Sequence, residues 1–527
     1  MTGGNISENS RRIARNTVLL YFRMFLMLLV GLYTSRVVLN ALGQDDFGIY
    51  GAVGGVVALF GILTGSLAGA ISRFLAYEMG KEEQRLEEVF STTVLVQVVM
   101  ALLVLLVAEG VGIWFLNAKM VIPDGRMEAA NWVLQCSILM FVVNMLAVPY
   151  NAAIIAHEKM DAFAYIGIVE ALLQLAVALT IRFSSTDRLV LYAVLMLTVA
   201  LLVRFLYSWY AHRHFSECRF RLRRVDRSFV KQIASYTSWT FLGNGASVLN
   251  AQGINILMNL FFGVRVNAAR DVSVKLEGNV SRFIFNITTA INPQINKSYA
   301  AGRLSYMHEL VCKGAKYSYF LFYFFAMPLI LEAPALLEFW LGQVPNYAVE
   351  FVRISLVSSL FVAIGNPFTT GIFATGDVKR YQIVASLTNV MAFPLAYAAF
   401  KLGSAPTAAY WMVLGTSLLV LVERVWMACR QIQMPFGLVF RELIWKALRV
   451  SVVAFIVPAA LCFLQDPSVW RAVEVVLSGF AMTALSAFFL GTTAGERALV
   501  VDAVKKKLNN IQLGLSGIQR ESTTCSI

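Results

Sequence analysis

Residues 89–115 read VFSTTVLVQVVMALLVLLVAEGVGIWF, and this stretch decides the class of fold. Glu109 is the one charged residue in it. An α-helix rises 1.5 Å per residue, so about 20 such residues cross the roughly 30 Å hydrocarbon core of a membrane. A helix of this length on a soluble protein would carry a polar face toward water. The stretch therefore predicts a transmembrane helix.

The same pattern recurs along the whole chain. Hydrophobic residues make up 58% of the sequence and charged residues 14%, against about 25% charged in soluble domains. We predict an all-α polytopic membrane protein with about 14 transmembrane helices. The other thirteen spans are 17–40, 48–71, 131–156, 161–182, 189–210, 232–261, 271–295, 313–337, 348–374, 381–401, 406–429, 446–464 and 472–491.

Basic residues between the spans predict the topology. The segment 211–231 carries seven Lys and Arg residues, and the tail carries Lys505, Lys506 and Lys507. The predicted outside loops 40–47 and 338–347 carry none. Cytoplasmic loops are the ones enriched in Lys and Arg, so both termini should be cytoplasmic. This distribution accounts for the net charge of +13 without a nucleic-acid partner.

An internal repeat predicts two equivalent halves. The segment Pro149–Ala156 (PYNAAIIA) is echoed 218 residues later by Pro367–Ala374 (PFTTGIFA). Six spans fit in that offset, which is typical of parallel repeats in transporters. We predict an N-lobe over 1–210, a basic linker over 211–231, a C-lobe over 232–430, two additional helices over 431–491 and a tail over 492–527. Pro149 and Pro367 would act as hinges, because proline disrupts helix hydrogen bonding.

Motifs for enzyme chemistry are absent from the sequence. It has no P-loop and no GxSxG elbow. The six cysteines are scattered, without the spacing of a zinc site or a disulfide framework. We expect no cofactor and no catalytic residues.

The span 271–295 carries the most informative polar residues. Asp271, Lys275, Gly278, Arg282, Asn286 and Thr289 fall in one stripe about 80° wide at helical periodicity. Such a stripe cannot face lipid, because each charge at the membrane centre costs at least about 2.5 kcal/mol. It either lines a cavity in which Lys275 and Arg282 hold an anion, or it attaches the helix to a neighbour while Asp271 pairs with Lys275.

Three further groups of polar residues lie within spans. In the span 232–261, Asn244, Gln252, Asn255 and Asn259 share one face and suit either sugar hydroxyls or contacts between helices. In the first span, Arg23 and Arg36 suit a diphosphate, although Arg36 is near enough to the outer end to reach the membrane surface. Glu170, together with Asp271 and Glu277, could couple transport to an ion.

Several short motifs together resemble the polysaccharide (O-antigen) flippases of lipopolysaccharide biosynthesis. The resemblance extends to about residue 430. The motifs are Arg15-Asn16-Thr17, Leu20-Tyr21, Arg23-Met24, Tyr33-Thr34-Ser35-Arg36-Val37-Val38-Leu39, Leu42-Gly43, Asp46-Phe47-Gly48-Ile49-Tyr50, Ala156-His157-Glu158-Lys159-Met160, Gly253-Ile254-Asn255-Ile256-Leu257, Asn267-Ala268-Ala269-Arg270, Pro293-Gln294-Ile295, Lys297-Ser298-Tyr299-Ala300 and Ala374-Thr375-Gly376-Asp377.

That family belongs to the multidrug/oligosaccharidyl-lipid/polysaccharide exporter superfamily. The resemblance implies two six-helix lobes, a cationic cavity and an undecaprenyl-diphosphate oligosaccharide as substrate. It further implies flipping from the inner to the outer leaflet of the bacterial cytoplasmic membrane by alternating access, in a MATE-like fold that functions as a monomer. We expect Arg23, Arg36, Lys275 and Arg282 to hold the diphosphate, and coupling to H⁺ or Na⁺ stays open.

Three other functions are consistent with parts of the sequence. A cation-coupled multidrug exporter of the same superfamily would typically carry a carboxylate in its first helix, where this chain has arginines. A membrane polysaccharide polymerase would need a large outside loop, and none is predicted. A peptidoglycan lipid II flippase would share the same chemistry and differ in the sugar.

Overall fold

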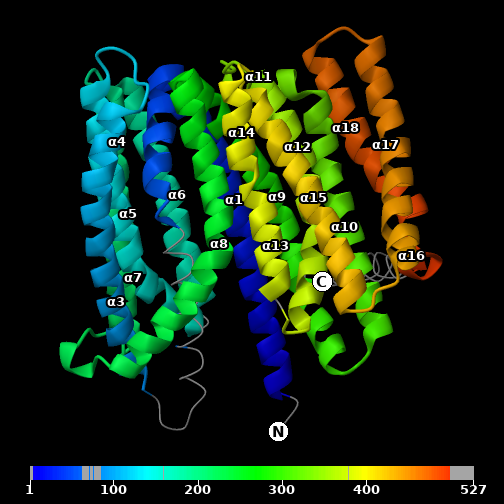
Figure 1. The fold of residues 1–527 in the computed structure, drawn as a ribbon, viewed down its shortest axis with the longest axis horizontal. Coiled ribbons are helices and arrows are strands. Elements are labelled where there is room, and N and C mark those ends of the chain that lie inside the picture. Colours follow the sequence, from blue (N-terminus) through cyan, green and yellow to red (C-terminus); the bar gives the residue numbers. More distant parts are fainter. Residues whose placement is uncertain are drawn as a thin grey trace, which may run out of the picture. The chain divides into compact units, whose positions relative to one another are not determined.

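A computed structural model describes residues 4–61, 71, 75, 85–157, 159–377 and 379–498 of the 527-residue chain (Figure 1). Within these residues every regular element is a helix. The longer helices are α1 (Gly4–Ala58), α3 (Leu86–Val107), α5 (Met127–Ala156), α6 (Met160–Phe183), α7 (Arg188–His214), α8 (Arg227–Phe262), α9 (Val264–Ala300), α10 (Leu304–Leu331), α12 (Ala348–Ala374), α13 (Lys379–Val390), α14 (Ala392–Lys401), α15 (Thr407–Gln431), α17 (Trp445–Leu464) and α18 (Val469–Ser486).

Shorter helical segments complete these spans. After a π-helical turn at Ala108–Gly112, α4 (Ile113–Ala118) extends α3. The helix α11 (Ala333–Leu341) follows α10, and α16 (Phe436–Val439) leads through the turn Phe440–Ile444 into α17. A final π-helical turn, Ala487–Gly491, extends α18.

The predicted membrane spans are confirmed as helices within the described residues; residues 62–70 of the second span, 48–71, lie outside them. In the described part of the chain, eleven helices are long and apolar enough to cross a membrane. One of them, Leu26–Ala58, combines parts of the first two predicted spans. The helices α8 and α9 coincide with the spans 232–261 and 271–295, and α9 carries too many polar residues to be recognised by apolar composition. The fold is therefore an all-α membrane protein with about fourteen spans.

Gly43 separates the first two predicted spans. It lies inside α1 with φ 78° and ψ 175°, a conformation that joins two helical segments across a kink. Residues with a side chain rarely adopt positive φ, whereas glycine does so at little cost. The break predicted at 40–47 is therefore a sharp kink at one residue rather than an extended loop.

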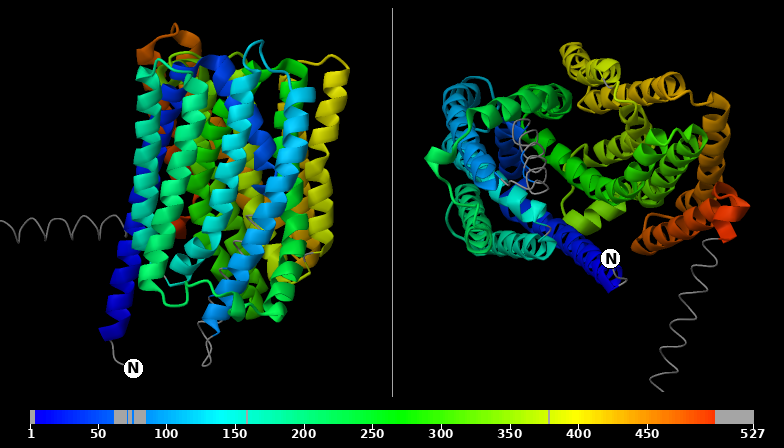
Figure 2. Two further views of the ribbon diagram at one scale, coloured as in Figure 1. Left: turned by 90° about the vertical axis from the view of Figure 1, so that its left-hand side faces the viewer. Right: turned by 90° about the horizontal axis from the view of Figure 1, so that it is seen from below.

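Contacts divide the chain into two compact units. The first comprises Met1–Asn279, Leu336–Ser359 and Asp377–Arg424. Within it α5 packs against α7, and α1 packs against α6 and α8. The axes of the helices between Leu86 and His214 are nearly parallel (Figures 1 and 2). Ile49, Ala52 and Val53 of α1 are buried in the core that these helices share.

The second unit comprises Val280–Ala335, Leu360–Gly376 and Val425–Ile527. Its centre is α10, which packs against both α17 and α18, and these two helices also pack against each other. They form a hairpin that Figure 1 shows in orange and red. The lobe boundaries predicted at 1–210 and 232–430 stay a prediction.

Candidate functional site

A polar face occupies the first half of α9, inside the first unit. Its centre is Lys275, whose side chain is exposed although the helix has the length of a membrane span. The Lys275 Nζ atom lies 4.5 Å from the centroid of the Phe47 ring on α1. In the part of the chain that the structure describes, no carboxylate forms an ion pair with this ammonium group. The cation is held by an aromatic face and stays accessible to an anion.

Asp271, one turn before Lys275, does not form the i, i+4 ion pair with it. The Asp271 carboxylate instead packs directly on the backbone of Gly51 in α1. A Cβ atom added at Gly51 would lie 1.7 Å from the Asp271 Oδ2 atom. The two charges of this helical turn therefore have different surroundings, with the carboxylate against a neighbouring helix and the ammonium group exposed.

The face remains open beyond Lys275. A Cβ atom at Gly278 would meet no atom within 4 Å, which means that space rather than a neighbouring helix lies beside the backbone there. Arg282, which belongs to the second unit, has an exposed side chain. Within the first unit, this side of α9 therefore presents the Lys275 cation and no packing partner at Gly278.

A buried network attaches the start of α9 to α8. The Asn255 Oδ1 atom accepts hydrogen bonds from Asn267 Nδ2 at 2.7 Å and from an Arg270 nitrogen at 3.5 Å. Arg270 also donates to the Ala251 carbonyl at 2.6 Å. Asn255 itself donates to the Gly51 carbonyl of α1 at 3.3 Å. The network therefore joins the start of α9 to α8 and, through Asn255, to α1, all within the first unit.

The predicted amide face is thus largely occupied by contacts within the protein. Asn259 is fully buried, accepts from the Val121 N–H at 3.0 Å and donates to the Val121 carbonyl at 3.2 Å. Asn255 is 1% exposed. Gln252 is partly exposed, and the Asn244 side chain lies outside those that the structure describes. In this conformation Asn255 joins α8 to α1 and α9, Asn259 joins α8 to the loop before α5, and Gln252 keeps the better access to a ligand.

Three glycines of α1 allow α8 and α9 to approach closely. A Cβ atom at Gly48 would lie 1.9 Å from the Val264 carbonyl oxygen, and one at Gly55 would lie 1.9 Å from Asn255 Nδ2. With Gly51 they form an i, i+3, i+7 stripe. Small residues at such spacing permit close helix packing in membranes. This stripe was not among the predicted functional residues, although its spacing is visible in the sequence.

Polar contacts supplement this packing at the end that is predicted to lie outside the membrane. Arg36 donates to the Phe339 carbonyl at 3.0 Å, and Asn40 donates to the Leu341 carbonyl at 2.8 Å. These carbonyls belong to the last turn of α11, where helix geometry leaves them without a partner. Arg265 of α9 forms an ion pair with Asp45 at 2.6 Å. We call the glycine stripe and these contacts the outer seal.

Asp46, next to Asp45, contacts different helices. The guanidinium of Arg126 binds both carboxylate oxygens of Asp46, at 2.8 and 2.6 Å, and also reaches Asp187 at 2.6 Å. The hydrogen bond from Arg126 keeps the pKa of Asp187 below its usual value. Bidentate pairs of this kind fix geometry. The two neighbouring aspartates therefore stabilise the outer seal and the α5–α7 region separately.

The remaining predicted residues lie at several places. Glu277 accepts a hydrogen bond from Ser359 at 2.6 Å, and Glu170 accepts one from Gln174 at 3.3 Å on its own helix. Pro149 and Pro367 are buried in α5 and α12, and each helix continues seven residues beyond its proline. The Arg23 side chain lies outside those described.

Groups that could hold a metal ion are absent from the described residues. The first five cysteines of the chain are free thiols, and Cys525 lies outside the described range. Phe47 and Arg270 were not assigned roles from the sequence. A buried arginine and an aromatic ring near a membrane lysine are weak signals until the neighbouring helices are known.

Comparisons with known proteins agree with this architecture. A family model described as "Polysaccharide biosynthesis protein" matches residues 13–298. No curated protein matches the sequence. The fold is similar to that of a solved lipid II flippase, MurJ, in an inward closed conformation, with a TM-score of 0.67, 12% identity and coverage of 90% of this chain and 98% of that one.

Multidrug transporters share the fold as well. An outward-facing multidrug resistance MATE family transporter of the MOP superfamily has a TM-score of 0.59 at 12% identity and covers 80% of this chain and 95% of its own. An inward-facing one also has a TM-score of 0.59 at 12% identity, with 79% and 98% covered. At these identities the likeness shows the fold, which transporters of different substrates share.

Proposed function

This chain belongs to the polysaccharide biosynthesis protein family, and we propose that it is a flippase for a lipid-linked oligosaccharide. The substrate would be an undecaprenyl-diphosphate oligosaccharide repeat unit, moved from the inner to the outer leaflet of the bacterial cytoplasmic membrane for lipopolysaccharide or O-antigen polymer synthesis. Both termini would be cytoplasmic, and a monomer would suffice.

The observation that carries this proposal is the exposed cationic face of α9. A lysine at membrane depth is costly unless it faces a cavity or a partner, and Lys275 has the Phe47 ring beside it and no paired carboxylate among the described residues. Gly278 leaves space next to it. A diphosphate has the charge that such a face attracts, and Arg282 and Gln252 would extend the contacts to phosphate and sugar.

Alternating access requires a closure that can open. The outer seal has the properties of one. It combines close packing of α8 and α9 on three glycines with one exposed ion pair and a few hydrogen bonds to helix ends. Exposed ion pairs contribute about 1 kcal/mol or less, so these polar contacts can be exchanged without a large barrier. Arg36 belongs to this closure in the present conformation, and a phosphate contact would follow rearrangement.

Ion coupling is a separate proposal. Asp271 and Glu277 lie within two turns of Lys275 on α9, and Glu277 accepts a hydrogen bond from Ser359. A carboxylate that exchanges a proton or sodium ion between leaflets needs access to both sides in turn. Asp271, which contacts the glycine stripe, would change its surroundings when the stripe opens. Glu170 is the alternative, on α6.

A multidrug exporter of the same fold is the competing function. Such an exporter would need an acidic site for cationic drugs, and the exposed charge at the centre of the α9 face is positive. Overexpression would then lower drug susceptibility without affecting polymer synthesis, whereas a flippase would show the opposite pattern.

Lipid-linked glycan analysis in a deletion strain tests the proposal. Repeat units linked to undecaprenyl diphosphate should accumulate in the inner leaflet, and surface polymer should be lost. The double variant Lys275→Ala/Arg282→Ala should fail to complement at normal expression, while Lys401→Ala, an exposed cation on α14, should complement fully. Normal polymer without accumulated intermediates, in a strain lacking a redundant flippase, would exclude this function.

A further inference from the structure

An apolar groove in the second unit runs between α10 and α18. Tyr317, Phe320, Leu321 and Phe324 of α10 line one wall, and Thr483, Ala484, Ala487, Phe488 and Thr492 line the other. Its volume is about 580 Å³. The groove is open on one side and its walls are almost entirely apolar, so it suits the hydrocarbon chain of a lipid.

A polar pocket adjoins the groove at the end of α10 that the topology places in the cytoplasm. It has a volume of about 220 Å³. It is lined by Glu309, Cys312, Lys313 and Lys316 of α10, by Leu438, Arg441 and Glu442, and by Thr493 and Glu496. Three of these side chains are cationic and three are carboxylates, so the pocket carries both signs of charge and no net charge.

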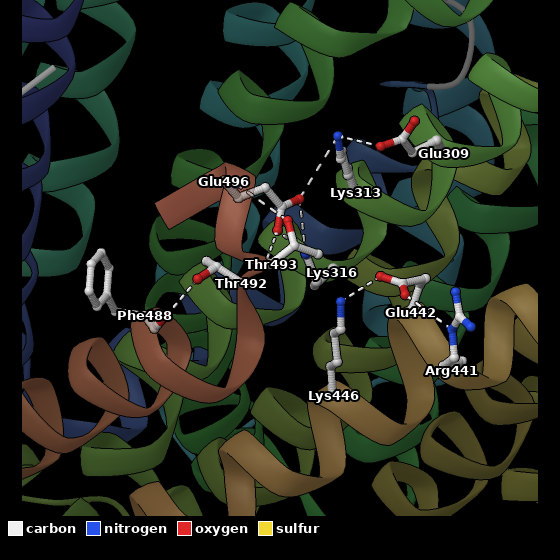
Figure 3. A network of polar contacts seen from close by, with 10 residues as sticks. All are labelled: Glu309, Lys313, Lys316, Arg441, Glu442, Lys446, Phe488, Thr492, Thr493 and Glu496. Atoms are coloured by element: carbon white, nitrogen blue, oxygen red, sulfur yellow. Dashed lines mark hydrogen bonds and ion pairs between the residues drawn. The ribbon is translucent and has the colours of Figure 1, made fainter. Parts of the chain in front are cut away.

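Glu496 lines the pocket and Tyr317 lines the groove, and a hydrogen bond between them connects the two. Lys316 Nζ donates to both Glu496 oxygens, at 2.9 and 3.2 Å, and lies 4.8 Å from the centroid of the Tyr317 ring. Glu496 also accepts hydrogen bonds from the Thr493 N–H and from Tyr317. Figure 3 shows Phe488 and Thr492 on one side of Glu496 and Lys313 and Glu309 on the other.

The charges at the base of the pocket and those at its rim are not equally accessible. The side chains of Lys316 and Glu496 are 2% and 11% exposed, so this ion pair is inaccessible to a headgroup. Lys313 and Glu309 form a rim pair at 2.6 Å and are 36% and 54% exposed. Arg441 is 78% exposed and lies 3.4 Å from Glu442. The rim therefore offers two accessible cations and one accessible carboxylate.

We propose that this combined site binds a phospholipid of the inner leaflet that has a phosphoethanolamine headgroup. The phosphate would contact Lys313 and Arg441, the primary ammonium would contact Glu309, and one acyl chain would fill the groove. A headgroup without an ammonium group would leave Glu309 without a partner once Lys313 contacts the phosphate. A choline headgroup has the same charges but lacks N–H donors for the carboxylate.

The order of the residues along α10 agrees with the orientation of a lipid. The pocket residues 309–316 precede the groove residues 317–324 on a helix that enters the membrane from the cytoplasmic side in the predicted topology. The headgroup would therefore lie at the membrane surface, with the acyl chain directed toward the membrane centre. Such a lipid would connect α10 to the α17–α18 hairpin.

Lipid binding to the purified, delipidated full-length chain tests the proposal without any measurement of transport. Phosphatidylethanolamine, phosphatidylcholine and phosphatidylglycerol with identical acyl chains, and undecaprenyl phosphate, would be titrated separately and followed by native mass spectrometry and thermal shift. We expect phosphatidylethanolamine to bind at least about tenfold more tightly than the others, because only its primary ammonium group can donate a charge-assisted hydrogen bond to Glu309.

Variants separate the headgroup from the chain. Lys313→Gln/Arg441→Gln and Glu309→Gln should each reduce the preference for phosphatidylethanolamine about tenfold. Ala484→Trp places a large ring in the groove at an exposed position and should prevent binding while the fold is kept. Lys401→Gln, an exposed cation on α14, is the matched control and should bind like the wild type.

Equal binding of the three phospholipids, tighter binding of phosphatidylglycerol, or displacement of phospholipid by undecaprenyl phosphate would each overturn the proposal. Unchanged binding to Ala484→Trp would do the same. Because all of these measurements concern lipid binding alone, a failed flippase assay would leave this site intact, and a failed lipid assay would leave the proposed function intact.

Discussion

Replacement of Gly48 by alanine should open the outer seal. The added Cβ atom would lie 1.9 Å from the Val264 carbonyl oxygen. Carbon and oxygen atoms in contact normally lie at least about 3.3 Å apart, so α1 and the start of α9 would have to separate by roughly 1.4 Å. The obstacle is backbone, so a change of side-chain rotamer cannot relieve the overlap.

The cost of this overlap can be expressed as a population. Overpacking of well-packed sites costs about 1–3 kcal/mol. At 1.4 kcal/mol per factor of ten, a cost of 2 kcal/mol would change the ratio of closed to open outer seal about thirtyfold. The change favours conformations in which the outer end is open, because only the closed seal contains the overlap.

Thiol labelling from outside the cell would measure the opening. The reporter is Lys275→Cys in a background without native cysteines. Position 275 lies eleven residues, about 16 Å, along α9 from Val264, and the closed seal should protect it from a membrane-impermeant maleimide. Gly48→Ala should increase its labelling rate at least fivefold. Ser185→Cys, in an exposed loop predicted outside, controls for reagent access.

Gly54→Ala provides the matched control. Gly54 lies on the same helical segment, and a Cβ atom there would meet nothing within 4 Å. Its labelling rate should equal that of the reporter alone. Equal rates for Gly48→Ala and Gly54→Ala, with both proteins folded, would refute the reasoning that close backbone contact at Gly48 keeps the outer seal closed.

Three further predictions follow from the contacts. Burial raises the pKa of Glu496, but the Thr493 N–H and the Lys316 ammonium group outweigh this effect and lower the pKa to about 2. A lowered pKa stabilises the fold at pH values above the unfolded pKa of about 4.3, so Glu496→Gln should reduce the free energy of unfolding at pH 7 by about 3–5 kcal/mol and thereby lower Tm. The difference in Tm from wild type should shrink as pH falls from about 4.3 to 2. A constant difference across that range would exclude this charge pair as the cause. Asn259→Ala should reduce stability by about 2 kcal/mol, because it removes two hydrogen bonds to the Val121 backbone, each worth about 1 kcal/mol; a Tm unchanged in detergent alongside lost transport would instead favour a sugar contact. Gly278→Leu should abolish polymer complementation at normal Tm, because the side chain would occupy the open space beside α9, and full complementation would show that no substrate passes there.

Much of the fold could be predicted from the sequence. In the part of the chain that the structure describes, the predicted spans coincide with helices because the apolar composition that drives membrane insertion is local in the chain. The kink between the first two spans was placed within a few residues, and glycine at position 43 explains it. The span 271–295 was recognised by the period of its polar residues, although its composition is too polar for recognition by hydropathy.

The site was only partly predictable. Lys275 was predicted as a site residue and stays a prediction, whereas its aromatic partner Phe47 lies 228 positions earlier in the chain, and no local pattern connects them. The expected alternative, an Asp271–Lys275 pair, has correct helical spacing, yet the carboxylate packs against Gly51 instead. Spacing along one helix defines which residues share a face, but it does not identify the neighbour that the face meets.

The sequence by itself determined the class of protein, the number of spans and the stripe of α9, because insertion and helical periodicity depend on residues close together in the chain. Only the tertiary structure decided which polar groups are used in packing. Asn255 and Asn259 satisfy their hydrogen bonds with α1, α9 and the Val121 backbone, whereas Lys275 stays exposed. A polar side chain in a membrane needs a partner, and that partner comes from helices distant in sequence, whose contact is fixed by packing.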